Sequence, residues 1–412
     1  MRYQVLIKLA SLPVALFSLW QAFRYKDPLC YWQRFGYRLE KQQGKQPLWL
    51  HAASVGEVSA AIPLILAIME KHPSLPIVIT TFTPTGKQVA QKRLPDSVQH
   101  IYLPIDNNGP LKRFYKALNP QCGLIMETEL WPNLFKMANK LSIPLFIING
   151  RLSKRTLNTK PWIKRLYRTT LSYPQAILAR SSQDKKHYIA LGASPETTRE
   201  IGNIKYGALQ SLQTDAPQRL LQRPYVLAAS THNNEEKRIT NIWKSLHTGK
   251  LLLVIVPRHP YRTTKIMEQL RQLTDKISVR SNNESIDEDT EIYLADTVGE
   301  LMPFMAYAKF VVMGGSLVPV GGHNILEPAM LGKAIIFGPH MENFAEECKQ
   351  FLANKAALQF NNEIELKNTL TYLLSSPDAL IELGENAKKL VSQNTDILER
   401  YISAIEEYCP IS

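Results

Sequence analysis

The sequence predicts an α/β protein made of two Rossmann-like domains, each a parallel sheet covered by helices. Its length of 412 residues suits two domains of about 200 residues each. Short β-branched runs alternate with longer amphipathic segments, and one polar stretch divides them into two series. The apolar content of 45% is that of a globular protein and excludes a multi-span membrane protein.

The first series begins after residue 47 and alternates strand and helix patterns. The strand candidates are residues 47–53, 75–83, 98–104, 122–128, 144–150 and 176–180. Helical spacing of apolar residues marks segments between them, for example residues 58–71, 84–94 and 109–118. This βαβ alternation predicts a parallel sheet with helices on both faces.

The second series repeats the pattern after a polar linker that ends in Pro224. Its strand candidates are residues 225–231, 250–257, 308–315 and 333–339, and its helix candidates are residues 235–246, 263–273 and 324–332. A long helical tract, residues 376–407, closes the chain, and by analogy we expect its last part to cross back to the first domain. The predicted parts are a membrane-associating segment (1–40), a first Rossmann-like domain (41–205), a linker (206–224) and a second Rossmann-like domain (225–412) that faces the first across a cleft.

The N-terminal segment is apolar and surrounded by basic residues. Its apolar run from Val5 to Phe23 is interrupted by Lys8 and is expected to bend or break near Pro13, so its uncharged core is shorter than the ~20 residues of a clean spanning helix. Residues 1–50 hold eight Lys and Arg against two acidic residues, and the whole chain has a net charge of +13. We expect the segment to lie on an anionic lipid surface.

Other interpretations of this terminus and charge are open. The segment is alternatively a helix buried on the first domain, or a cleaved signal peptide, although no small-residue cleavage site precedes the basic stretch at Arg24. Nucleic-acid binding is disfavoured because no helix-turn-helix, zinc-finger or aromatic RNA-binding signature is present. The four cysteines are scattered without paired spacing, which predicts neither disulfides nor a zinc site and fits a reducing compartment.

Glu57 opens the helical segment that follows the first strand. Ser54 and Glu57 match a capping box, in which the two side chains satisfy N–H groups at a helix start. The turn also places Glu57 at the edge of the sheet where open α/β proteins bind ligands. Both a capping role and a catalytic role are therefore open at this point.

Polar residues follow other strands of the first half. Glu127 and Glu129 come after an apolar strand, and Asn149 and Arg151 come at the end of the next. Acidic residues in such places are by default helix-start residues. Polar groups at the ends of three successive strands nevertheless favour a ligand-binding or catalytic site at the edge of the sheet where these strands end.

The second half predicts a nucleotide-phosphate pocket. Arg258 and His259 follow one strand and supply a fixed positive charge, and Gly314, Gly315 and Ser316 follow another. Glycines permit close approach of backbone N–H groups to a phosphate, and a helix starting near Asn324 would point its positive end the same way. Glu327, three residues after Asn324, is placed to turn toward a ribose.

Histidines raise the question of a metal. His232, His259 and His323 lie near these loops, but none forms an HxH or HExxH spacing, and no DxD cluster is present. We therefore expect phosphate neutralisation without a metal ion, and no cofactor.

Nine motifs in order resemble the bacterial 3-deoxy-D-manno-octulosonic acid (Kdo) transferases of lipopolysaccharide assembly. They are HAASVGEVSAAIPL, TTFTPTGKQVA, METELWPNL, INGRLS, GNIKY, VPRHPYR, DTVGEL, GGSLVPVGGHNILEPA and GPHMENF. The resemblance runs from the N-terminal segment to about residue 350. It implies a GT-B glycosyltransferase on the cytoplasmic face of the inner membrane, which moves Kdo from CMP-Kdo to a tetraacylated lipid A precursor with inversion and without metal.

The resemblance also implies roles for residues. The glutamate of the SVGE loop, Glu57, would be the general base, with Glu127 or Glu129 supporting it. The donor-binding residues implied are Lys205, Arg258, His259, Gly299, Glu300, Leu301, Gly314, Gly315, Ser316, Asn324 and Glu327. Lys205 would reach the Kdo carboxylate, and the loop at Gly299 would border the nucleotide.

Two other functions compete with this one. The same two domains occur in other GT-B nucleotide-sugar transferases and in UDP-sugar epimerases, which protection by UDP instead of CMP would reveal. In the second alternative, the chain is a non-catalytic module that binds a membrane surface, and Glu57 is only a helix cap.

Overall fold

The computed structural model describes residues 2–40, 44–152, 154–212, 218–246 and 248–410. It divides into two compact units, Met1–Ser211 with Asp396–Ser412, and Leu212–Thr395. The first unit thus runs past the predicted boundary at 205 and takes the end of the predicted 225–412 range. Residue 41, the predicted start of the first domain, and residues 213–217 of the predicted linker lie outside the described residues.

The first unit is built on a seven-stranded parallel sheet. Its order is β3 (Gln99–Tyr102), β2 (Ile77–Thr81), β1 (Leu48–His51), β4 (Cys122–Met126), β5 (Leu145–Gly150), β6 (Ala176–Ala179) and β7 (Thr198–Glu200). The six predicted strands are all present. The strand order reverses between β1 and β4, which are neighbours although two strands separate them in sequence.

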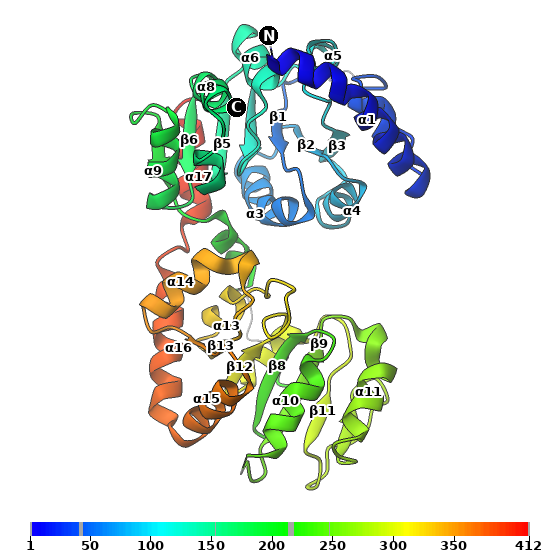
Figure 1. Ribbon diagram of the computed structural model, residues 1–412, viewed down its shortest axis with the longest axis vertical. Coiled ribbons are helices and arrows are strands. Elements are labelled where there is room, and N and C mark those ends of the chain that lie inside the picture. Colours follow the sequence, from blue (N-terminus) through cyan, green and yellow to red (C-terminus); the bar gives the residue numbers. More distant parts are fainter. Residues whose placement is uncertain (1, 41–43, 153, 213–217, 247, 411–412) are drawn as a thin grey trace. The chain divides into compact units, whose positions relative to one another are not determined.

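Helices cover both faces of this sheet (Figure 1). One face carries α5 (Asn108–Leu118), α6 (Pro132–Lys140), α8 (Pro161–Thr170) and α9 (Ser182–Leu191), and the other carries α3 (Val55–Lys71), α4 (Pro84–Arg93) and α17 (Ile397–Glu406). Short elements complete the unit: α2 (Leu29–Arg34), α7 (Lys154–Leu157) and the 3₁₀ helix η1 (Ile204–Leu212). Both faces of the strands are therefore buried, as their nearly uninterrupted apolar sequences predict.

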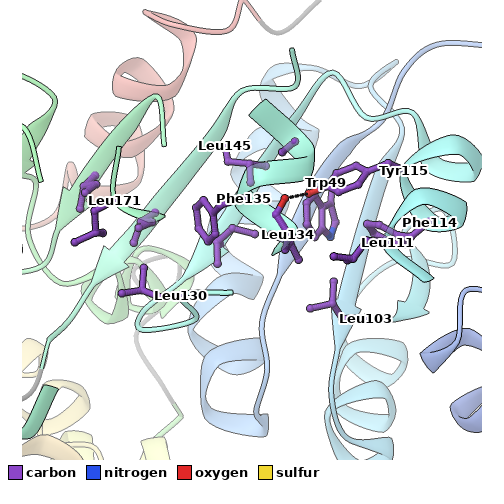
Figure 2. Close-up of a cluster of buried hydrophobic side chains, with 14 of the residues drawn as sticks. Trp49, Leu103, Leu111, Phe114, Tyr115, Leu130, Leu134, Phe135, Leu145 and Leu171 are labelled. Carbon is purple, nitrogen blue, oxygen red and sulfur yellow. Dashed lines mark hydrogen bonds between the residues drawn. The ribbon is translucent and has the colours of Figure 1, made fainter. Parts of the chain in front are cut away.

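A group of aromatic rings lies among leucine side chains in the core between the sheet and α5 and α6 (Figure 2). Trp49 packs edge-on against Phe114 and Tyr115, with ring centroids 5.2 and 5.9 Å away. The Tyr115 hydroxyl donates a hydrogen bond of 3.1 Å to the carbonyl oxygen of Leu134, which ties α5 to α6. This core fixes the strand ends that carry the polar residues.

The C-terminal helix α17 belongs to the first unit. The tract expected as one long helix is two, α16 (Pro377–Ser392) and α17, separated by a short polar stretch. Tyr401 of α17 is fully buried, accepts a hydrogen bond from the Asn149 N–H (3.2 Å) and donates one to the carbonyl oxygen of Gly202 (2.8 Å). The end of the chain thus braces β5 and the segment before η1.

The N-terminal helix α1 (Arg2–Arg24) is continuous through Pro13, so the predicted break there is wrong. Contacts near both ends hold it: the Tyr3 hydroxyl donates to Asp106 at 2.5 Å, and Gln21 accepts from the Cys30 thiol at 3.7 Å. Among the described residues, α1 is the one helix long and apolar enough to cross a membrane, judged by length and composition alone. Arg34, expected among the surface cations, is buried and donates to the carbonyl oxygens of Leu103 and Phe82.

The second unit repeats the architecture. Its parallel sheet has the order β10 (Ile277–Val279), β11 (Ile292–Leu294), β9 (Leu252–Pro257), β8 (Tyr225–Thr231), β12 (Phe310–Met313), β13 (Ala334–Phe337) and β14 (Leu358–Gln359). The four predicted strands occupy its centre, while β10, β11 and β14 were not predicted. Strand order reverses between β8 and β12. The predicted α/β class with two parallel sheets is confirmed.

Helices again cover both faces of the second sheet. One face carries α10 (Glu235–Lys244), α11 (Thr263–Arg271) and α15 (Glu363–Ser375), whose apolar residues join the core of the unit. The other carries α12 (Leu301–Tyr307), α13 (Leu326–Met330) and α16. The remaining elements are η2 (Pro260–Arg262), η3 (Glu342–Phe344) and α14 (Ala345–Ala353).

A substitution of Gly123 in β4 tests the close packing of β4 against Trp49 of β1 and Leu145 of β5. A Cβ at this position would lie 2.5 Å from Leu145 and 2.6 Å from Trp49, both in the core. We expect Gly123→Ala to lower the free energy of unfolding by about 1–3 kcal/mol, the usual cost of overpacking. Urea denaturation measures this. Gly109→Ala in α5 is the matched control, because its nearest neighbour would be the flexible end of Arg113 at 3.7 Å, and an equal loss there would contradict the packing argument.

Candidate active site

Glu57 lies at the point of the first sheet where strand order reverses. It follows β1, while Glu127 and Glu129 follow β4, the strand next to β1. Ligands of open parallel sheets bind outside the carboxyl ends of the strands at such a reversal. The three carboxylates that the sequence singled out therefore converge where a substrate is expected.

The predicted capping box is present at the start of α3. The Ser54 hydroxyl accepts from the Glu57 N–H at 3.3 Å, and Oε2 of Glu57 accepts from the N–H groups of Ala53 at 2.5 Å and Ser54 at 3.4 Å. No hydrogen bond from a described residue reaches Oε1. Capping and catalysis are thus compatible in Glu57, because the box occupies one oxygen and leaves the other.

The surroundings of Glu57 raise the pKa of its carboxyl group to about 7. Burial of the carboxyl group is the largest cause, followed by the negative charges of Glu127 and Glu129, while the N–H groups of Ala53 and Ser54 oppose the shift. A base with a pKa near 7 combines a usable deprotonated fraction with enough basicity to take a proton from a hydroxyl group.

Glu127 and Glu129 are held by different contacts. Glu127 has a φ of +52°, a left-handed conformation that costs free energy in a non-glycine residue, and Tyr188 donates to its carbonyl oxygen at 2.9 Å. Glu129 accepts from the Trp131 indole N–H at 2.6 Å, and burial raises the pKa of its carboxyl group. Both charges act on Glu57, and Glu127 contributes more.

Lys205 and the end of β5 lie in the same unit. Asn149, in a left-handed conformation at φ +50°, accepts from the Ile204 N–H at 3.2 Å through its side chain. The Lys205 N–H bonds to the side-chain oxygen of Asn203 at 3.1 Å. Asn149 therefore orients the segment that carries Lys205, a contact that sequence spacing alone does not reveal.

The second unit also places its polar residues where strand order reverses. His232 follows β8, and Gly314 follows the neighbouring β12. A Cβ on Gly314 would lie 2.5 Å from the carbonyl oxygen of Ser230, and the Gly314 N–H bonds to the Ala229 carbonyl oxygen at 2.7 Å. Gly314 is thus needed for backbone packing, and its N–H is occupied within the protein.

Glu235, which the sequence analysis did not single out, organises this loop. It is fully buried at the start of α10, and its carboxylate accepts from the N–H groups of His232 (2.8 Å), Gly315 (2.7 Å) and Leu317 (2.8 Å). The buried Ser316 hydroxyl donates to the Met313 carbonyl oxygen and accepts from the Gly338 N–H. The contacts of Gly314, Gly315 and Ser316 therefore favour a role in building the loop over one as direct phosphate donors.

Three histidines cluster beside this loop. Nε2 of His232 and Nε2 of His323 are 2.9 Å apart in stacked rings, and the ring of His259 lies 5.6 Å from that of His232. Burial, then the positive charges of His232, Arg258 and His259, lower the pKa of His323 to about 4. Among the described residues, no group of three or more His, Cys, Asp or Glu has metal-binding geometry.

Arg258 is exposed, and no described residue forms an ion pair or hydrogen bond with its guanidinium group. Burial lowers the pKa values of His232 and His323 and raises that of Glu327, and the positive charge of Arg258 acts on all three groups by lowering their pKa values. Arg258 therefore lies near these three side chains. Asn324 donates to Glu327 at 3.1 Å and accepts from the Leu326 N–H. The helix expected near Asn324 is the five-residue α13, which starts at Leu326.

The loop of Gly299, Glu300 and Leu301 precedes α12. Gly299 has a φ of +92° and faces open space, whereas Glu300 is paired with Arg280 at 2.7 Å, which holds the pKa of its carboxyl group below its usual value. Asp296 accepts from the Thr263 hydroxyl at 2.7 Å and thereby joins this loop to the segment after Arg258. The carboxylate of Glu300 thus has a partner in Arg280, and Gly299 is the open position of the loop.

Comparison with known proteins identifies the family of the chain. Residues 30–208 match the sequence family described as 3-deoxy-D-manno-octulosonic-acid transferase (Kdo transferase). The 3-deoxy-D-manno-octulosonic acid transferase of Haemophilus influenzae is 35% identical over 398 residues, 93% of this chain and 92% of that protein. The relative of the same description in Rickettsia felis is 33% identical over 382 residues, 90% of this chain and 81% of its own.

Solved structures support the fold. The UDP-GlcNAc 2-epimerase of Neisseria meningitidis, solved with UDP-GlcNAc, has a TM-score of 0.58, covering 88% of this chain and all of its own. At 14% identity this likeness shows the two-domain GT-B-like fold alone. The full-length likeness to the transferases is the stronger relation, and it shows that the chain belongs to the Kdo transferase family, the glycosyltransferases that transfer Kdo in lipopolysaccharide biosynthesis.

Proposed function

We propose that this Kdo transferase moves Kdo from CMP-Kdo to a tetraacylated lipid A precursor, lipid IVA, with inversion and without a bound metal ion. The observation that carries the proposal is Glu57, whose carboxyl pKa is raised to about 7 and whose Oε1 is left free by the capping box. It lies at the strand-order reversal of the first sheet, where an acceptor is expected.

The reaction needs one proton acceptor. A hydroxyl oxygen of the lipid A precursor attacks the anomeric carbon of Kdo, and the bond from that carbon to the phosphate oxygen breaks with its electron pair leaving on CMP. Oε1 of Glu57 takes the hydroxyl proton as the new bond forms. Glu127 and Glu129 support this step by keeping the pKa of Glu57 high.

The donor half of the proposal rests on the second unit. Arg258 carries a fixed positive charge that has no ion-pair or hydrogen-bond partner among the described residues and is suited to neutralise a phosphate, and His259 follows it in the chain. Asn324 and Glu327 form a hydrogen-bonded pair suited to a ribose diol. Lys205 is proposed for the Kdo carboxylate, and Gly299 for the border of the nucleotide site.

The proposed location is the cytoplasmic face of the inner membrane. The docked side of α1 carries polar residues such as Tyr3 and Gln4, while its exposed side is apolar, with Leu9 69% exposed. The other exposed apolar residues of α1 are Val5, Leu6, Leu12, Leu16, Phe17, Leu19, Trp20 and Phe23. A helix docked by its polar side and apolar outside is suited to lie in an anionic lipid surface.

Glu57→Gln separates capping from catalysis, because glutamine also completes a capping box. We expect kcat to fall about 10²–10⁴-fold while the free energy of unfolding changes little. Purified protein in detergent, with CMP-Kdo, the tetraacylated acceptor and EDTA, is assayed by mass gain of the acceptor. Glu70→Gln, at the exposed far end of α3, is the control and keeps wild-type activity. Equal transfer by Glu57→Gln would return Glu57 to a purely structural role.

The pH dependence tests the charges around the base. Because Glu57 acts when deprotonated, kcat/KM is expected to rise with pH through about 7 and then level off. Of the two neighbouring carboxylates, Glu127 raises the pKa of Glu57 more. Glu127→Gln removes this negative charge, so the rising limb of the pH profile should move to lower pH. Glu70→Gln should leave it in place. A limb that stays fixed in Glu127→Gln would contradict the assignment of the limb to Glu57.

A further inference from the structure

A cavity of about 350 Å³ opens beside the carboxylates of the first unit. It lies between the start of α1, the loop after β4 and α8, and Glu129 is part of its wall. The other lining residues are Tyr3, Leu6, Thr128, Leu130, Trp131, Pro132, Trp162, Ile163, Leu166 and Tyr167. Its volume falls at the lower end of the range of ligand pockets, roughly 300–1,000 Å³.

The chemistry of the wall is that of a hydrocarbon site. Aromatic and aliphatic side chains supply most of the lining. Among the polar groups, Glu129 and the Trp131 indole N–H are bonded to each other at 2.6 Å and are not left to a polar guest. An apolar guest would therefore gain from burial without breaking this hydrogen bond.

Helix α8 has an apolar side and a basic side. Trp162, Ile163, Leu166 and Tyr167 face the cavity, whereas Lys164, Arg165 and Arg168 are exposed. The whole stretch 151–168 contains seven Lys and Arg and no Asp or Glu. A ligand with both a hydrocarbon chain and phosphate groups matches these two sides.

The wall formed by α1 is fixed in place. Tyr3 donates to Asp106, and Gln4 donates to Asn133 at 2.5 Å, so the first turns of α1 are held on α6. Leu6 lines the cavity and is 49% exposed, and Leu9 continues the exposed apolar side one turn later. The cavity is thus continuous with the apolar surface proposed to contact lipid.

The geometry points to this cavity as the binding site for one acyl chain of the acceptor, with the acceptor phosphates on the basic side of α8. This inference rests on the proposed function, since it takes the acceptor to be a phosphorylated acyl lipid. Its consequence is positional: an acyl chain held against Glu129 keeps the sugar hydroxyl near Glu57.

Leu166→Trp, which fills the cavity, tests the inference. KM and kcat are measured with CMP-Kdo and two acceptors in the same detergent: the tetraacylated precursor and its fully deacylated disaccharide bisphosphate. We expect KM for the acylated acceptor to rise about tenfold, the effect of losing two buried methylene groups, with KM for the deacylated acceptor unchanged. Leu166→Ala is a second variant for the case that Leu166→Trp does not fold. It should also raise KM for the acylated acceptor only, by a smaller factor.

Leu141→Trp is the matched control. Leu141 is 48% exposed at the far end of the nine-residue α6, about 13 Å from the end that lines the cavity, and its substitution should alter neither KM. Two results would overturn the inference. An equal change of KM for both acceptors would indicate a general distortion of the site. An unchanged KM for both would indicate that the acyl chains are bound by bulk lipid contact alone. If the wild type transfers Kdo to neither acceptor, the proposed function fails instead.

Discussion

The hydrogen bonds between Glu57 and the N–H groups of Ala53 and Ser54 fix a carboxylate at the strand-order reversal of the first sheet. Much of the unit serves that placement. Trp49 and Gly123 set β1 beside β4, so that Glu57 meets the two glutamates that follow β4. Because only one oxygen is bound, the same side chain both starts α3 and retains a free basic atom.

The second unit has a glutamate at the place that corresponds to Glu57, and there the glutamate has a structural role. Glu235 also follows the first strand of its sheet and starts the next helix, but it is fully buried, and its two oxygens accept from three N–H groups. Burial thus decides the role of the same residue type. The partly buried Glu57 is available for chemistry, while Glu235 holds the loop that carries His232 and Gly315.

The sequence predicted the central strands and the carboxylates because both depend on local patterns. The box at Ser54 and Glu57 is a three-residue spacing, and the buried strands are long enough to show their composition. The short strands β7, β10, β11 and β14 have only two or three residues, too few to show a periodic pattern. The role of Glu235 was missed because its partner Gly315 lies 80 residues away. The close packing of Gly314 on the backbone of Ser230 could not be predicted either, because the two residues are far apart in the sequence.

The most direct test of the account is the protonation of Glu57 itself, measured without turnover. An infrared difference titration of wild type against Glu57→Gln isolates the carboxyl band of this residue. We expect a single group with a midpoint at about pH 7 that is absent from the variant. A midpoint near 4.3, the ordinary value for glutamate, would contradict the claim that burial and the two neighbouring carboxylates prepare Glu57 as the base.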